Sequence, residues 1–243
     1  MHQQPLAENI TTIGEHNVQF PVDGYEDGTG YLTSPPKKDG YGLVMIQEVW
    51  GMNKSLTITA NTFANAGEFA VLVVDLYKGK VATNREEAQK LKAEMNYTES
   101  LAIVASAVKW LKSNGCSKVG VVGFCMGGGI TIATATQYDV MDAALAFYGV
   151  PDLTKYDLSK IKCPLKANFA EKDQSPIAGE EGRKKLEEAL MKASIPYEIK
   201  VWPGVGHAFM NQDSPHYNEE TAKEALADAV SWFKYKFGQT ESK

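Results

Sequence analysis

Apolar runs alternate with segments of helical spacing along most of this chain, and this alternation predicts its fold. Continuous apolar runs between turn residues predict buried strands, whereas apolar positions three or four residues apart predict amphipathic helices. The predicted strands cover residues 16–20, 28–34, 42–47, 69–74, 119–123, 142–148, 164–170 and 197–202. The predicted helices cover residues 55–66, 83–95, 98–113, 126–137, 177–193 and 217–237.

Strands that alternate with helices in this way favour a mostly parallel sheet covered by helices on both faces. The length of 243 residues fits one α/β domain, and we expect residues 1–243 to form a single domain with an extended or flexible segment at 1–15. Gly67 is expected to close the helix 55–66. Asn84 and Thr98 are expected to cap the two helices that follow.

Composition and charge exclude several classes of protein. A net charge of −5 leaves no electrostatic footprint for nucleic acid. The most apolar run, residues 69–77, is too short for a membrane span and contains Asp75. The N-terminal residues show no secretion-signal pattern. Three cysteines without CxxC spacing argue against a disulfide framework or a zinc site, so we expect a cytoplasmic protein.

Residues 119–130, V-G-V-V-G-F-C-M-G-G-G-I, carry the strongest candidate chemistry. An apolar run ends at Gly123, Cys125 follows two residues later, and glycines open a predicted helix. This is a GxCxG nucleophile elbow, in which glycines allow a strained strand-to-helix turn to expose the sulfur. A helix N-terminus favours a thiolate and offers N–H groups to an oxyanion. The alternative is a glycine-rich turn that holds a packed, inert cysteine.

The choice of a base for this thiol is nearly forced, because the chain contains four histidines. His2 lies near the terminus, His16 in a predicted edge strand, and His216 before a surface helix. His207 follows the strand 197–202 in a glycine-rich loop, although it is also compatible with a loop histidine of no function. Reactive groups gather at the carboxyl ends of parallel strands, so His207 is the predicted base.

Asp173 follows the strand 164–170 and is the predicted acid, because α/β-hydrolases place nucleophile, acid and histidine in that chain order. The acid would orient the imidazole and stabilise its charged form. Asp173 is also compatible with a cap for the helix that begins near Pro176. Asp152, Asp157 and Glu171 are other carboxylates in the same half of the chain.

Five motifs in order match a known pattern. They are Q-E-V-W-G at 47–51, D-L-Y at 75–77, G-F-C-M-G-G at 123–128, F-Y-G-V at 147–150 and G-H-A-F at 206–209. With these motifs the chain resembles the dienelactone hydrolase (carboxymethylenebutenolidase) family over about residues 16–237. The resemblance implies the single-domain α/β-hydrolase fold.

The resemblance also implies the roles of the site residues. Cys125, Asp173 and His207 would form a catalytic triad, and the backbone N–H groups of Val49 and Met126 would form the oxyanion hole.

Glu48 is implied as an acid that contacts the resting thiol and takes its proton when substrate displaces the carboxylate. A carboxylate beside the sulfur would keep this oxidisable group unreactive until substrate arrives. Glu48 is also compatible with a cap for the turn at Gly51.

Substrate contacts are expected from aromatic side chains and one arginine. Trp50, Tyr148 and Phe209 would wall an apolar pocket near the sulfur, or belong to the core.

Arg85 matches the first of two arginines with which dienelactone-cleaving members bind the substrate carboxylate. Asn211 stands at the second arginine position and Gln89 at a tyrosine position, so the sequence departs from that pattern.

The function expected from these residues is hydrolysis of small carboxylic esters or lactones through a cysteinyl acyl-enzyme. The expected partner is the small-molecule substrate, with no cofactor, metal, nucleic acid or membrane, and the protein would be a monomer or weak homo-oligomer. One alternative is a class I glutamine amidotransferase, although that class has glutamate where this chain has Phe209. Another is a non-catalytic thiol sensor.

Overall fold

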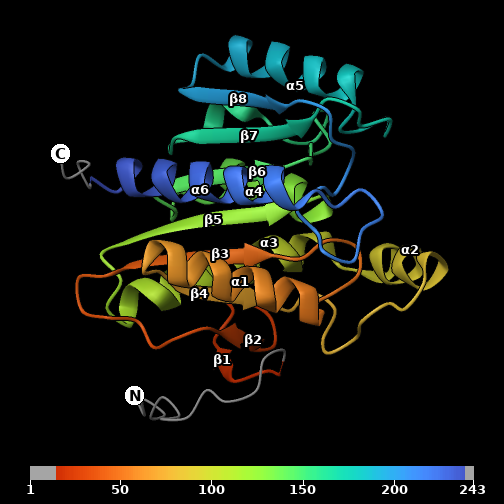
Figure 1. Ribbon diagram of the computed structural model, residues 1–243. Helices are drawn as coiled ribbons and strands as arrows, with labels where there is room; N and C mark the ends of the chain where they lie inside the picture. Colours follow the sequence, from red (N-terminus) through yellow and green to blue (C-terminus); the bar gives the residue numbers. More distant parts are fainter. Residues whose placement is uncertain (1–14, 239–243) are drawn as a thin grey trace.

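Eight strands form one sheet in the computed structural model, which describes residues 15–238 (Figure 1). The segment predicted at 1–15 therefore lies, apart from Glu15, outside the described residues. The strands are β1 (Val18–Phe20), β2 (Gly28–Leu32), β3 (Tyr41–Ile46), β4 (Ala70–Val74), β5 (Lys118–Phe124), β6 (Ala143–Phe147), β7 (Leu165–Ala170) and β8 (Tyr197–Trp202). Their order in the sheet is β1-β2-β4-β3-β5-β6-β7-β8.

The sheet is parallel from β4 to β8 and antiparallel only where β1 and β2 join one edge. The central strand β3 pairs with β4 and β5, and Ile46 lies opposite Gly123 at the carboxyl end. The mostly parallel sheet predicted from the apolar runs is confirmed. Parallel pairing brings the segments after β3 and β5 to one edge of the sheet.

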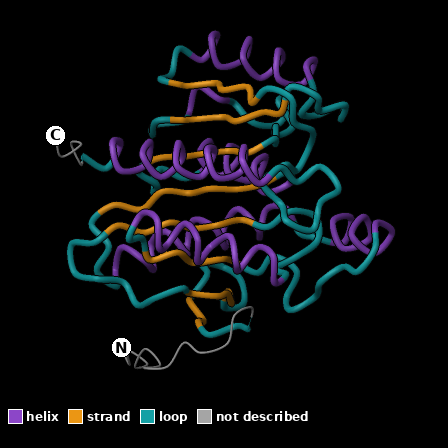
Figure 2. The backbone as a smooth tube through the Cα atoms, in the orientation of Figure 1, coloured by secondary structure: helices purple, strands orange, loops and turns teal. Residues whose placement is uncertain are grey.

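Helices cover both faces of the sheet (Figures 1 and 2). Within residues 15–238 they are α1 (Lys54–Gly67), α2 (Arg85–Glu94), α3 (Tyr97–Ser113), α4 (Met126–Gln137), α5 (Glu180–Ala193) and α6 (Glu219–Lys236), with the 3-10 turn η1 (Leu158–Lys160). α1 packs beside α6 on one face, and α3 beside α4 on the other. None of these helices is long and apolar enough to cross a bilayer.

The core lies between these layers and fixes the position of the elbow helix. Every residue from Met126 to Thr136 in α4 is buried, and β5 is buried from Val119 onward. A helix buried on all sides cannot slide without breaking the packing around it. The turn that joins β5 to α4 is therefore held from both ends.

Two helix ends differ from the sequence predictions. Gly67 lies inside α1, and Glu68 takes the left-handed conformation at its end with φ 59°. Asn96, not Thr98, caps α3, because its side chain accepts a hydrogen bond from the Glu99 N–H. The predicted cap at Asn84 is confirmed by its bond from the Glu87 N–H.

Candidate active site

Cys125 occupies the sharp turn between β5 and α4, where its backbone has φ 53° and ψ −115°. Positive φ is strained for a residue with a Cβ, and such strain persists only where surrounding structure enforces it. The Cys125 N–H donates to the Phe147 carbonyl (2.9 Å), and its own carbonyl accepts from the Gly128 N–H (3.0 Å). The side chain is half-buried, so the sulfur is accessible at the carboxyl edge of the sheet.

Two glycines make this turn possible because the backbones around it approach closely. A Cβ on Gly127 would lie 2.6 Å from the carbonyl oxygens of Ile46 and Gln47. A Cβ on Gly123 would collide with the Gly127 carbonyl. The spacing that predicts an elbow therefore has a steric cause, since no side chain fits at either position.

His207 and Asp173 lie in the loops after β8 and β7, and backbone hydrogen bonds tie these loops together. The Lys172 N–H donates to the Val205 carbonyl at 2.9 Å, and the Glu171 N–H donates to the Trp202 carbonyl at 2.9 Å. Because β7 and β8 are adjacent parallel strands, both loops leave the sheet at the edge where Cys125 stands.

The three predicted residues lie in hydrogen-bond contact. His207 Nδ1–H donates to Asp173 Oδ2 at 2.6 Å, and His207 Nε2 lies 3.2 Å from Cys125 Sγ. Asp173 Oδ1 also accepts from the Ser175 N–H at 2.8 Å, which fixes the carboxylate. Asp173 does not cap α5, whose N-cap is Gly179. A thiol, an imidazole and a carboxylate in this series can transfer a proton from sulfur to nitrogen.

The other candidate carboxylates bind elsewhere. Asp152 pairs with Lys155, Asp157 caps η1, and Glu171 accepts from the Gly204 N–H at 2.7 Å.

Electrostatics favour a charged imidazole between the sulfur and the carboxylate. Burial alone would lower the pKa of His207, but its hydrogen bonds with Asp173 and Cys125 raise that pKa to about 10. Burial acts to raise the pKa of Asp173, but the hydrogen bonds from His207 and Ser175 and the charge of His207 together outweigh it, so that pKa is lowered. Both shifts favour an ionised His207–Asp173 pair.

Two backbone N–H groups on separate elements belong to the residues that follow Glu48 and Cys125. Val49 follows β3, and Met126 is the first residue of α4. Within residues 15–238, neither N–H donates a hydrogen bond to another group. Free N–H groups beside a nucleophile are what an oxyanion hole requires.

Glu48 does not make the resting contact with the thiol that the resemblance implies. Its buried carboxylate accepts from the Tyr148 hydroxyl (3.2 Å) and from the Asn211 amide (2.5 Å), while Cys125 bonds to His207. Burial raises the pKa of Glu48, and these two hydrogen bonds oppose the shift. The Glu48 carboxyl is therefore held by Tyr148 and Asn211 and makes no hydrogen bond with the Cys125 sulfur.

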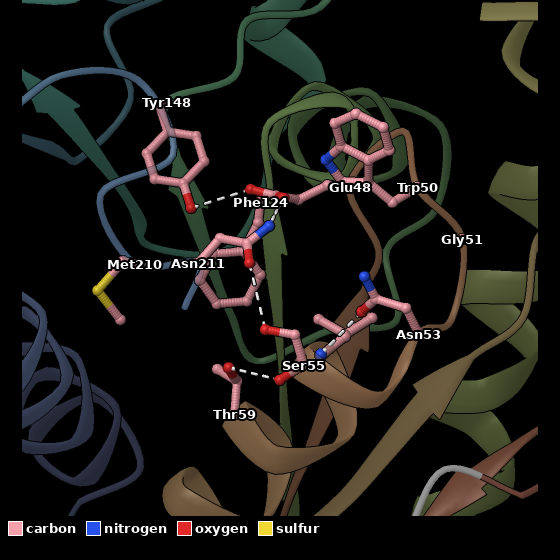
Figure 3. Close-up of a pocket in the computed structure, with 11 residues that line it drawn as sticks. Glu48, Trp50, Gly51, Asn53, Ser55, Thr59, Phe124, Tyr148, Met210 and Asn211 are labelled. Carbon is pink, nitrogen blue, oxygen red and sulfur yellow. Dashed lines mark hydrogen bonds between the residues drawn. The ribbon is translucent and has the colours of Figure 1, made fainter. Parts of the chain in front are cut away.

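A cavity opens next to this network, as Figure 3 shows. Its apolar wall consists of Trp50, Leu56, Phe124 and Met210. Its polar wall consists of Glu48, Asn53, Ser55, Thr59, Tyr148 and Asn211. The cavity adjoins the reactive residues, because Phe124 precedes Cys125 and the Tyr148 ring centroid lies 5.0 Å from that of His207.

Two of the four predicted substrate contacts do not line this cavity. Phe209 is fully buried and packs against Phe147, Tyr148 and Trp202, so it belongs to the core and not to a pocket wall. Arg85 is exposed at the start of α2, and its substrate role stays a prediction.

Asn211 and Ser55 are the residues that sequence reasoning missed. Ser55 Oγ–H donates to Asn211 Oδ1 at 3.2 Å, and Asn211 in turn holds Glu48. The sequence signal at Asn211 is its departure from the arginine of the family pattern, which bears on substrate charge and does not by itself indicate the contact with Glu48. Metal chemistry has no ready site here, since residues 15–238 contain no cluster of three His, Cys, Asp or Glu side chains arranged for a metal ion.

Comparisons with known proteins show the family of this chain. The model of the dienelactone hydrolase family matches residues 29–237. "Protein usf" of Aquifex pyrophilus is 34% identical over 228 residues, covering 89% of this chain and 96% of that protein. "Putative carboxymethylenebutenolidase" of Aquifex aeolicus is 32% identical over 230 residues, with 89% and 96% covered.

A solved structure shows the same fold. The "Putative Dienelactone Hydrolase" of Klebsiella pneumoniae superimposes with a TM-score of 0.76 at 23% identity, covering 93% of this chain and 98% of that one. The predicted α/β-hydrolase fold is thus confirmed. The chain belongs to the dienelactone hydrolase family and is a hydrolase of the carboxylic ester and lactone class.

Proposed function

We propose that this protein hydrolyses small carboxylic esters or lactones through an acyl-enzyme formed on Cys125. The observation that carries the proposal is the unbroken series Cys125 Sγ, His207 Nε2, His207 Nδ1 and Asp173 Oδ2, with contacts of 3.2 and 2.6 Å. The raised pKa of His207, about 10, favours imidazolium at neutral pH, which is the partner a thiolate nucleophile requires.

The proposed reaction has two halves. The Cys125 thiolate, paired with the His207 imidazolium, attacks the carbonyl carbon, and the N–H groups of Val49 and Met126 bind the oxyanion. The C–O bond then breaks, and His207 gives its proton to the departing alcohol. In the second half the neutral His207 removes a proton from water, hydroxide attacks the thioester, and the carboxylic acid leaves as the thiolate–imidazolium pair is restored.

The proposed role of Glu48 is to tune this pair from a fixed position. The His207 imidazolium is close enough to lower the pKa of Glu48, against the larger effect of burial. By reciprocity, an ionised Glu48 stabilises the imidazolium form of His207. Tyr148 and Asn211 hold the carboxyl in place, so its action need not involve contact with the resting thiol.

The test compares the wild type with Cys125→Ala on p-nitrophenyl acetate and on a series of lactones. We expect Cys125→Ala to lose turnover and the wild type to accumulate an acyl adduct whose mass maps to the peptide with Cys125. Cys163→Ala is the matched control, because burial raises the pKa of that thiol to about 12 and leaves it unreactive.

Turnover that survives Cys125→Ala would refute the proposal. Glutamine hydrolysis would point to an amidotransferase instead. A sulfenate on Cys125 under peroxide without any ester turnover would point to a sensor.

A further inference from the structure

The cavity beside the thiol lacks a positive charge. Among the described residues that line it there is no lysine, arginine or histidine, and the acidic group is Glu48. Arg85, the arginine expected to bind a substrate carboxylate, is exposed on α2 and outside the lining. A carboxylate that entered this cavity would lose water without gaining a counter-charge from the lining, because His207 lies outside the lining and is already paired with Asp173.

The polar groups of the inner wall are already bonded to one another. Tyr148 and Asn211 each donate to one oxygen of Glu48, and Ser55 donates to Asn211 (Figure 3). Both Glu48 oxygens are acceptors in this arrangement, so neither offers a proton to an entering anion. The polar groups of this wall therefore satisfy one another, and the Glu48 carboxyl is part of the wall.

Two donors of the cavity remain available for substrate. Asn53 uses its side-chain oxygen to cap α1 at Leu56, and within residues 15–238 its amide N–H groups donate to no group. The indole N–H of Trp50 likewise has no acceptor in the described part of the chain. Both are uncharged donors beside apolar surface, which suits a carbonyl, ether or hydroxyl oxygen on an otherwise apolar skeleton.

We propose that this cavity selects esters or lactones whose substituent is uncharged and oxygen-bearing or apolar, and that it rejects substrates carrying a carboxylate. The inference names the substrate class of the proposed hydrolase and rests on that function. Rejection follows from the missing counter-charge and from the carboxyl of Glu48, whereas acceptance follows from the apolar wall and from Trp50 and Asn53.

The experiment uses two lactones with one skeleton, γ-phenyl-γ-butyrolactone and its para-carboxylate. We expect kcat/KM of the wild type to be about tenfold or more higher for the neutral lactone. Calorimetric titration of Cys125→Ala with both lactones measures selection without turnover, and we expect the same preference in affinity.

The outcomes separate the two proposals. Equal or tighter binding of the carboxylate, or binding of neither lactone by Cys125→Ala, overturns the inference. Selective binding of the neutral lactone with turnover that does not depend on Cys125 supports the inference and refutes the acyl-enzyme.

A positive charge introduced into the cavity tests whether the selection against carboxylate substrates arises there. Thr59 lines the cavity, half-buried on α1, and Thr62 is exposed on the same helix; each donates its hydroxyl to the carbonyl four residues before it. We expect Thr59→Lys to reduce the preference for the neutral lactone by about tenfold. Thr62→Lys, with the same added charge, should leave the preference as in the wild type, and an equal effect of both variants would contradict the assignment.

Discussion

The side-chain amide of Asn211 donates a 2.5 Å hydrogen bond to the buried carboxylate of Glu48. This contact joins the loop after β8 to the turn after β3, which lie 163 residues apart in the chain. Glu48 sits one residue before Val49, whose N–H is a proposed donor to the oxyanion. Asn211 sits four residues after His207, so the contact links the two halves of the site.

The first prediction concerns the strength of that contact. Asn211→Ala leaves a buried acceptor without its donor, and we expect the free energy of unfolding to fall by about 1–3 kcal/mol. Urea unfolding measures this loss, with Gln212→Ala at an exposed neighbouring position as the control. In a Glu48→Gln background the loss should shrink by about 1 kcal/mol, since the partner has changed. An identical loss in both backgrounds would show that Asn211 acts without Glu48.

The meeting of Cys125, His207 and Asp173 could be predicted from sequence because backbone geometry determines it. Parallel strands deliver their following loops to one edge, and the glycines around Cys125 leave few conformations for the elbow. The histidine was nearly forced by elimination. The apolar runs likewise predicted each strand to within a few residues.

The direction of individual side chains could not be predicted in the same way. Phe209 and Asn211 belong to one short turn, yet one ring enters the core and one amide reaches Glu48. Which side chain turns inward depends on Tyr148 and Trp202, which come from other strands. The cap at Asn96 has a local signal, because Glu99 stands three residues after it, whereas Leu101 stands at that spacing from Thr98.

The second prediction separates the histidines by function. We expect His207→Ala to lower kcat/KM for a neutral ester by about 10⁴-fold and Asp173→Ala by about 10²–10³-fold, because the acid acts through the base. His216→Ala, at an exposed histidine nearby, should retain wild-type activity. The double variant should be no worse than His207→Ala alone. An additive loss in the double variant would argue against a coupled unit.

The third prediction concerns the fall of kcat/KM at alkaline pH. With its pKa raised to about 10, His207 stays protonated through neutral pH and loses its proton as the pH rises through about 10. We therefore expect kcat/KM to fall with a midpoint near pH 10, after subtraction of spontaneous hydrolysis. Asp173→Asn removes a cause of the shift, so the midpoint should move down toward 6.5, the ordinary pKa of histidine. The same midpoint in both proteins would contradict the role of Asp173.

The fourth prediction tests the steric cause of the elbow. Gly127→Ala places a methyl group 2.6 Å from two backbone oxygens that cannot rotate away, and we expect a loss of about 3 kcal/mol in the free energy of unfolding. Gly204→Ala is the control, since φ there is 74° but no atom lies within 4 Å of the added Cβ. Its cost should be about 1 kcal/mol. Because Gly127 has no positive φ, a loss no larger than that of the control would contradict the steric cause.

The last prediction follows from the position of Phe209 in the core. Its ring is enclosed by Phe147, Tyr148 and Trp202, so Phe209→Ala should lower the free energy of unfolding by about 3–5 kcal/mol. Tyr235→Ala, at a residue 70% exposed, should change it by less than about 0.5 kcal/mol. Phe209→Leu keeps an apolar side chain there, and because the ring is not in the cavity, KM for the neutral lactone should stay within about twofold of the wild type. A large rise in KM for Phe209→Leu without loss of stability would indicate that Phe209 contacts the substrate.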